Sequence, residues 1–380
     1  MTADDDAVPH RERRSGQPRV LILTASVGEG HDLPARTLAA QLRSECPAAE
    51  TVIEDGLAPM GRLVTAISAD SGRIVFFHFQ WLWDLGFWFF AGPRATRSFT
   101  QALLARIGGE GLARLIDRVD PDVVVSTYPN TTEVLRRLRK SNRVRVPVCS
   151  AITDLSALHY WAGAGVDIHL IAYPQSVAEV KSIAGQAARV VTVHGLTAPE
   201  FLEPQLQSDA RRELDVHLEG SMVLVSGGGW GVGDVIGAVA VARSCTGVTQ
   251  VVCLCGRNES LRSRLIARFG EDPRVRVEGF TDQMASWMAA ADVLVHSTGG
   301  LTVLEAMMRG LPAISYGWGR GHIRLNNAAF RRFGLADVVA TRDELGPAIV
   351  RALARGRTPV DAFEGLPSAA SVVLGSCGSG

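Results

Sequence analysis

The sequence predicts an α/β protein of two Rossmann-like domains that face each other across a cleft. Short apolar runs rich in β-branched residues alternate with helical stretches, which is typical of a parallel sheet covered by helices on both faces. The pattern occurs twice, and each copy begins with a strand that runs into a glycine-rich loop. The length of 380 residues fits two domains of roughly 100–200 residues each. Open α/β sheets bind ligands at the carboxyl ends of their strands, so we expect the functional site in the cleft.

The composition is that of a soluble globular protein without a dominant charge. Apolar residues make up 47% of the chain and charged residues 21%, which suffices for a large core and excludes global disorder. The 39 basic and 39 acidic side chains cancel, and we therefore predict no nucleic-acid partner. The six cysteines are scattered, which indicates reduced thiols in the cytoplasm. We predict no metal site and no resident cofactor.

Composition also predicts the domain boundaries. Residues 1–17 have no apolar core that could act as a secretory signal, and we expect a disordered leader there. The N-terminal domain should cover 18–198 and the C-terminal domain 211–355, joined by the polar, proline-containing linker 199–210. Residues 356–380 end in a Gly/Ser-rich run, so we expect a flexible tail.

The strands of each domain can be placed in order. The N-terminal domain opens with an apolar run over 19–26, and further β-branched strands that end at small or polar residues follow over 121–129, 146–153, 167–174 and 189–195. The C-terminal domain restarts with a strand and glycine loop over 221–234, and further strands are expected within 248–258, 274–280, 291–300 and 311–317.

The first glycine loop reads SVGEGH and contains Gly28, Gly30 and His31. It departs from the dinucleotide fingerprint GxGxxG, because Leu33 stands at the third glycine position and no acidic residue ends a clear second strand. NAD is therefore not predicted. At the start of a helix the dipole disfavours the imidazolium, so His31 can serve as a neutral base or hydrogen-bond partner. The alternative is a histidine that only caps the turn.

The second glycine loop, SGGGWGVGD over 226–234, has five glycines in nine residues between a strand and a helix. Its amides can cradle a phosphate, but it lacks the Lys and Ser/Thr of a P-loop, which argues against an ATPase. The alternative is a tight turn without a ligand.

The segment 296–312 is the most informative. A strand ends at two adjacent glycines, and a short helix over 301–309 follows, closed by Gly310. The amides near Gly300 to Thr302 suit a diphosphate, and Glu305, one turn later, can reach the vicinal hydroxyls of a ribose. The alternative is that Glu305 is an ordinary solvated helix residue.

In their order and spacing, these motifs resemble the monogalactosyldiacylglycerol synthase and processive diacylglycerol glucosyltransferase family. More distantly they are similar to MurG, the GlcNAc transferase of peptidoglycan lipid precursors. The resemblance covers about 18–340 and includes CGRN at 255–258, GFTDQM at 279–284 and a TDxxxxHxxW-like segment from Thr153 to Trp161.

The resemblance implies a GT-B fold and an inverting glycosyltransferase that uses a UDP-sugar, with the donor in the C-terminal domain and the acceptor in the N-terminal domain. It makes His31 the catalytic base. It assigns the donor to Gly228, Gly229, Arg257, Phe280, Thr281, Gly299, Gly300, Leu301, Thr302, Glu305, His322 and Asn326, with Phe280 near the uracil, Gly300 to Thr302 on the phosphates and Glu305 on the ribose. It assigns the acceptor side to Gly28, Gly30, Asp154 and His159.

One loop departs from the family pattern. Where members carry Gln-Glu or Glu-Glu before the asparagine of the sugar-binding loop, this chain has His322, Ile323 and Arg324. Isoleucine cannot accept hydrogen bonds from sugar hydroxyls, so neither the donor sugar nor transfer itself follows from this loop.

The segment 74–90 holds nine of the 24 aromatic residues, among them Trp81 and Trp83, and arginines flank it. It is shorter than the ~20 apolar residues of a membrane span, and it suits an interfacial position that brings a lipid acceptor to an anionic membrane surface. The alternatives are a core helix and a dimer patch.

We therefore expect transfer of a hexose from a UDP-sugar to a hydroxyl of a lipid-like, diacylglycerol-type acceptor. The protein should be cytoplasmic and peripheral on the inner face of the cell membrane. The alternatives are a glycosyltransferase for a soluble metabolite and a catalytically silent nucleotide-sugar-binding protein, with a nucleotide-sugar epimerase as a lesser option.

Overall fold

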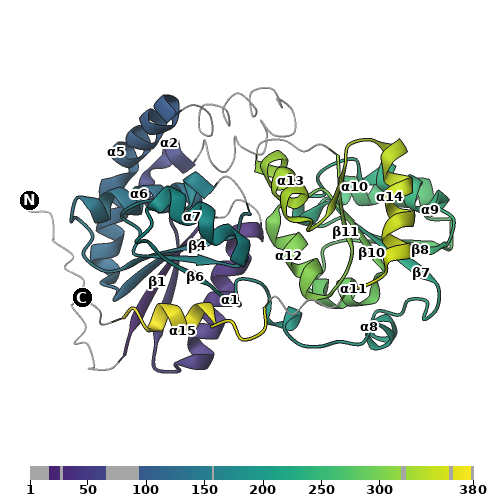
Figure 1. The fold of residues 1–380 in the computed structure, drawn as a ribbon, viewed down its shortest axis with the longest axis horizontal. Coiled ribbons are helices and arrows are strands. Elements are labelled where there is room, and N and C mark those ends of the chain that lie inside the picture. The colour runs from purple at the N-terminus through teal and green to yellow at the C-terminus, as the bar shows by residue number, and fades with distance from the viewer. Residues whose placement is uncertain are drawn as a thin grey trace, which may run out of the picture.

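The computed structural model describes residues 17–25, 29–65, 94–155, 158–317, 322–358 and 363–377. Its two parallel six-stranded sheets lie side by side, each flanked by helices (Figure 1). This arrangement confirms the predicted fold class of two Rossmann-like domains.

The N-terminal sheet has the strand order β2-β1-β3-β4-β5-β6. Its central strands are short and buried on both faces, as expected of a sheet with helices on either side. The strands of this sheet are β1 (Arg19–Thr24), β2 (Glu50–Asp55), β3 (Val123–Ser126), β4 (Val148–Ile152), β5 (Ile168–Ile171) and β6 (Arg189–Thr192). The helices are α1 (Glu29–Glu45), η1 (Ala58–Met60), α2 (Arg62–Thr65), α5 (Arg94–Val119), α6 (Pro129–Lys140), η3 (Leu158–Tyr160), η4 (Pro174–Ser176) and α7 (Val177–Ala184).

The C-terminal sheet has the order β12-β11-β10-β7-β8-β9. Its strands are β7 (Ser221–Ser226), β8 (Val248–Leu254), β9 (Val275–Glu278), β10 (Val293–His296), β11 (Ala313–Tyr316) and β12 (Asp337–Val339). Its helices, with the linker elements, are η5 (Pro199–Phe201), α8 (Gln207–Glu213), η6 (Gly228–Trp230), α9 (Val235–Ser244), α10 (Glu259–Phe269), α11 (Met284–Ala290), α12 (Gly300–Met308), α13 (His322–Phe333) and α14 (Arg342–Arg355). The chain order reverses between β7 and β10, and in the N-terminal sheet between β1 and β3, so these are the two switch points.

Two edge strands, β2 and β12, were not predicted. Both carry many partly exposed residues, so their sequences lack the continuous apolar run that marks the central strands. The premise that no acidic residue ends a second strand is therefore wrong, because β2 ends at Asp55. The Asp55 carboxylate accepts hydrogen bonds from the backbone amides of Leu57 and Ala58, so it caps the next turn.

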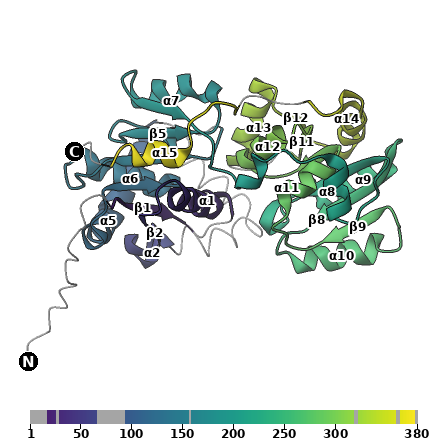
Figure 2. The ribbon, with the colours of Figure 1, turned by 90° about the horizontal axis from the view of Figure 1, so that it is seen from below.

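The expected flexible tail is wrong for its second half. A further helix of the N-terminal domain, α15 (Ala369–Leu374), packs against α1, as Figures 1 and 2 show. Ala369, Ala370 and Val373 are fully buried in the core beneath the N-terminal sheet. The Gly/Ser composition of the chain end concealed this short apolar stretch.

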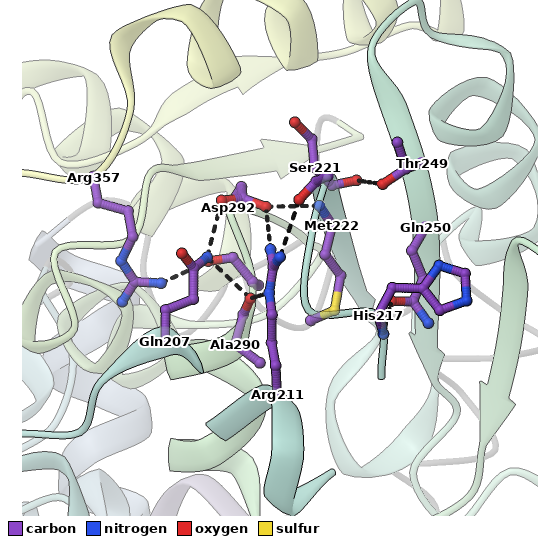
Figure 3. A network of polar contacts seen from close by, with 12 residues as sticks. Gln207, Arg211, His217, Ser221, Met222, Thr249, Gln250, Ala290, Asp292 and Arg357 are labelled. Carbon is purple, nitrogen blue, oxygen red and sulfur yellow. Dashed lines mark hydrogen bonds and ion pairs between the residues drawn. The ribbon is translucent and has the colours of Figure 1, made fainter. Parts of the chain in front are cut away.

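A polar network fastens the linker to the amino ends of β7 and β10 (Figure 3). Arg211 of α8, only 4% exposed, donates to Asp292 and to the carbonyls of Leu218, Gly220 and Ala290. Gln207 donates to the second carboxylate oxygen of Asp292. The side chains at the amino ends of these strands thus satisfy one another through hydrogen bonds.

Of the described helices, none combines the length and apolar character that crossing a membrane would require. All six cysteines are free thiols.

Candidate active site

The carboxyl ends of the two sheets meet at the domain interface. The segment after β4 lies against the start of α12, where a Cβ added at Gly300 would lie 3.3 Å from the Thr153 carbonyl oxygen and 3.3 Å from the backbone nitrogen of Leu155. Leu155 also packs with Phe330 of α13 in an apolar cluster that contains residues of both domains. The predicted acceptor and donor halves are therefore in direct contact.

His31 lies at the switch point of the N-terminal sheet, in the first turn of α1. Its Nδ1 is 3.0 Å from the carbonyl oxygen of Thr127, which follows β3. A carbonyl only accepts, so Nδ1 carries the hydrogen and the neutral ring has its basic lone pair on Nε2. The ring meets Tyr128 edge-on at 4.9 Å and lies 5.9 Å from the Trp161 ring. This arrangement orients the imidazole as a general base requires.

The rest of the first glycine loop differs from the expectation. Gly30 lies within the first turn of α1 rather than in a loop, and a Cβ there would meet no atom within 4 Å. Gly28 lies outside the described residues.

The second glycine loop packs closely against its neighbours. Gly228 has a φ of 69°, and a Cβ there would lie 2.7 Å from the Thr298 methyl group. A Cβ at Gly256 would lie 2.4 Å from the Gly228 carbonyl oxygen, and the Arg257 amide donates to the carbonyl of Gly229 at 2.8 Å. Glycine is needed here because three loops converge at the carboxyl ends of β7, β8 and β10.

The start of α12 has the backbone geometry that an anion site requires. Gly299 is its N-cap and supplies no side-chain cap, while Leu301 and Thr302 in the first turn are half-buried. The first-turn amides of a helix have no partner within the helix, and the dipole adds positive potential there. This geometry suits a diphosphate.

Glu305 is buried, with 6% of its surface exposed, so it is not a solvated helix residue. Burial raises its pKa to about 8. Burial alone causes this shift, and no hydrogen bond or ion pair from the described residues to the carboxyl group contributes to it. A buried carboxyl without a protein partner is suited to accept hydrogen bonds from a ligand.

His296, at the end of β10, was missed by sequence reasoning. It is 1% exposed, and burial lowers its pKa to about 4. The Thr298 amide donates to Nδ1 at 3.2 Å, and Nε2 has no hydrogen-bond partner among the described residues. The only sequence signal was a histidine directly before the STGG motif.

Arg257 and Phe280, both predicted on the donor side, form a pair. The guanidinium lies 4.0 Å from the ring centroid, and Phe280 is 51% exposed. Thr281 accepts a hydrogen bond from the Gln283 amide, so its hydroxyl also shapes the turn before α11.

Asn326 is fully buried, and it contacts the N-terminal domain. Its Nδ2 donates to Asp154 and its Oδ1 accepts from the Leu155 amide, both at 3.2 Å. The second oxygen of Asp154 accepts from the Trp161 indole at 3.0 Å. The predicted donor residue and the predicted acceptor residue are therefore hydrogen-bonded to each other.

The remaining predicted residues are less informative. His159 is exposed in η3, and His322 begins α13 with its side chain outside the described ones. The aromatic segment with Trp81 and Trp83 lies outside the described residues. In the parts of the chain that the structure describes, no three His, Cys, Asp or Glu side chains gather as a metal site requires.

Comparison with known proteins agrees with this geometry. The family profile described as monogalactosyldiacylglycerol (MGDG) synthase matches residues 31–197, and one described as glycosyl transferases group 1 matches 231–354. A probable monogalactosyldiacylglycerol synthase 2 of Oryza sativa subsp. indica is 31% identical over 320 residues, which cover 81% of this chain and 67% of the relative. A processive diacylglycerol beta-glucosyltransferase of Staphylococcus carnosus is 25% identical, covering 86% of this chain and 82% of the relative.

Among solved structures, MurG of Acinetobacter baumannii superposes with a TM-score of 0.56 at 14% identity, over 94% of this chain and 99% of that one. That likeness shows the GT-B fold. On the sequence identity and coverage of its relatives, this chain belongs to the monogalactosyldiacylglycerol synthase family and is a glycosyltransferase.

Proposed function

We propose that this protein transfers a hexose from a UDP-sugar to a hydroxyl of a diacylglycerol-type lipid, with inversion at the anomeric carbon. The names of its relatives support the substrate class. The observation that carries the proposal is the His31 ring, fixed by Thr127 with its basic nitrogen at Nε2. The ring lies next to Trp161, which is connected through Asp154 to Asn326 of the C-terminal domain.

On the donor side, the α12 amides from Gly300 to Thr302 would hold the diphosphate. Glu305 would accept hydrogen bonds from the ribose hydroxyls, and Phe280 would border the uracil. The glycines at 228 and 229 let the loop after β7 approach the phosphates. Arg257 adds positive charge for the leaving group, and the proposal includes no metal.

In the transfer step, Nε2 of His31 removes the proton from the acceptor hydroxyl as its oxygen forms a bond to the anomeric carbon. The bond between that carbon and the diphosphate oxygen breaks, and UDP leaves with the electron pair. The amide dipoles at the start of α12 stabilise the charge on the departing diphosphate. Attack on the face opposite UDP inverts the configuration.

The test of this function is the variant His31→Ala. Without the base, turnover should fall by about 10²–10⁴-fold, while UDP binds as in the wild type. The matched control is His217→Ala, an exposed histidine at the opposite edge of the C-terminal sheet. Radiolabelled transfer to diacylglycerol gives the rate, and calorimetry gives the UDP affinity. Full activity of His31→Ala would contradict the role of the base, and UDP binding without transfer from any UDP-sugar would favour the silent binding protein.

A peripheral position on the inner face of the cell membrane is part of the proposal. Its support is an apolar stripe on α5, formed by Phe99, Leu103 and Ile107, which are 69%, 45% and 45% exposed. They are spaced four residues apart and share one helix face. Arg106 is exposed beside them, which suits an anionic surface.

Replacing all three stripe residues by serine should weaken binding to anionic vesicles at least tenfold, because each inserted side chain contributes up to about 1.5–3 kcal/mol. Vesicle flotation measures the bound fraction, and Ile266→Ser on the exposed face of α10 is the control. Unchanged flotation of the triple variant would place the membrane contact elsewhere, and a wild type that stays in solution would favour a soluble metabolite as acceptor.

A further inference from the structure

The Asn326 side chain joins the two domains by a pair of hydrogen bonds that run in opposite directions. It accepts from the Leu155 amide and donates to the neighbouring carboxylate of Asp154. A carboxamide can do both at once, whereas a carboxylate could only accept and a hydrophobic side chain could do neither. Asn326 is fully buried and its bond to Leu155 is buried, whereas Asp154 is half-buried.

Asp154 in turn connects Asn326 to the surroundings of His31. Its other oxygen accepts from the indole of Trp161, which is 1% exposed. The Trp161 ring lies 5.9 Å from the ring of His31. A shift of Asp154 would therefore move the aromatic side chain against which the imidazole rests.

The same asparagine lies beside the start of α12. A Cβ added at Gly299 would lie 3.8 Å from its Nδ2. Gly300, the next residue, already packs against the Thr153 carbonyl and the Leu155 backbone. Asn326 thus stands between the amides proposed to hold the diphosphate and the segment that orients the base.

We propose that Asn326 is a positioning residue that fixes the donor half of the site relative to His31, through Asp154 and Trp161. This inference rests on the proposed function. It differs from a donor-sugar contact, because the amide acts through the opposite domain. The expected signature is a loss of kcat with little change in donor KM or UDP affinity.

Two single substitutions and their combination test this. Asp154→Asn leaves Asn326 with an amide opposite it, and Asn326→Asp sets two carboxylates against each other. Each should lower kcat about tenfold or more, because small displacements of reacting groups are costly. In the double exchange, Trp161 donates to the new amide oxygen, the amide donates to the new carboxylate, and that carboxylate still accepts from Leu155. We expect the double exchange to recover most of kcat.

Asn327→Ala is the matched control. This neighbouring asparagine is also buried, but its side-chain Oδ1 accepts a hydrogen bond from the Ser315 hydroxyl within the C-terminal domain. Asn327→Ala should lower the melting temperature, but its kcat should equal that of the wild type when both are assayed well below the melting temperature of the variant.

Three outcomes would overturn the inference: a double exchange that folds yet is as slow as the worse single variant, a single variant that raises donor KM at unchanged kcat, or an Asn327→Ala loss of the same kind. Hydrogen exchange at the Leu155 amide reports on the contact without turnover, and it should accelerate in Asn326→Ala. If the wild type transfers no hexose while Leu155 behaves in this way, the proposed function fails and the contact stands.

Discussion

The amino ends and the carboxyl ends of the strands in the C-terminal sheet differ in how their buried polar groups are satisfied. At the amino ends of β7 and β10, Arg211 and Asp292 satisfy each other and the surrounding carbonyls (Figure 3). At the carboxyl ends of the same strands, His296 keeps a ring nitrogen without a partner among the described residues, and Glu305 is buried with its pKa raised to about 8. At the amino ends the protein's own side chains satisfy the buried polar groups, whereas at the carboxyl ends we propose that a ligand does so.

The largest effect should come from breaking the polar network at the amino ends. Arg211→Ala removes the cation that pairs with Asp292 and the guanidinium donor to three carbonyls, while Asp292 keeps only the neutral donors Gln207 and Met222. The free energy of unfolding should fall by about 3–5 kcal/mol. Urea denaturation measures it. The control is Arg212→Ala, whose exposed pair with Asp209 should contribute less than about 1 kcal/mol. Equal losses in the two variants would mean that the network does not stabilise the amino ends of the strands.

Glu305→Gln, at the carboxyl ends of the strands, should raise stability where Arg211→Ala lowers it. Loss of the charged acceptor should weaken UDP binding by about 10–100-fold, because a hydrogen bond to a charged group is worth about 1.5–3 kcal/mol. The same variant should melt at a higher temperature than the wild type at pH 8, since it removes a buried ionisable group. Calorimetry and thermal unfolding measure the two effects. Unchanged UDP affinity would remove Glu305 from the ribose site.

A smaller effect should appear in the pH dependence of stability. The pKa of Glu305 in the folded state lies above its ordinary value, so the folded protein holds this proton more tightly than the unfolded chain. The resulting stability is complete below about pH 4.5 and is lost as the pH rises through about 8. Unfolding free energies measured from pH 5 to 9 should therefore fall more steeply for the wild type than for Glu305→Gln. Parallel profiles would show that Glu305 is not protonated in the folded state.

UDP binding should remove the proton from the Glu305 carboxyl group. Ribose hydroxyls that donate to Glu305 favour the carboxylate, so UDP binding below pH 8 should release a proton from the wild type. Calorimetry in buffers of different ionisation enthalpy detects the release, and Glu305→Gln corrects for protons that leave the diphosphate itself. A wild type and a variant that release equal numbers of protons would contradict the coupling.

Some elements of the fold could be predicted from the sequence and others could not. The central strands and the start of α12 were predictable because apolar runs, a glycine pair and the residues after them reflect local rules. The strands β2 and β12 are edge strands with little apolar signal, and α15 is a six-residue helix that depends on packing against α1. Their existence follows from tertiary contacts that the local sequence does not record.

The same limit applies to the site. Glu305 could be named from its spacing after Gly300, but whether it is buried depends on how α12 packs against the rest of the molecule. Asn326 and Asp154 are 172 residues apart, and no local pattern indicates that they are hydrogen-bonded. Contacts across the domain interface are therefore the part of the site that required the structure.

The most direct test of the account is a crystal structure with UDP bound. The diphosphate should contact the amides from Gly300 to Thr302, and the ribose hydroxyls should lie within hydrogen-bond distance of the Glu305 carboxylate. UDP bound elsewhere, or a Glu305 that stays buried without touching the nucleotide, would contradict the claim that a ligand satisfies the buried polar groups at the carboxyl ends.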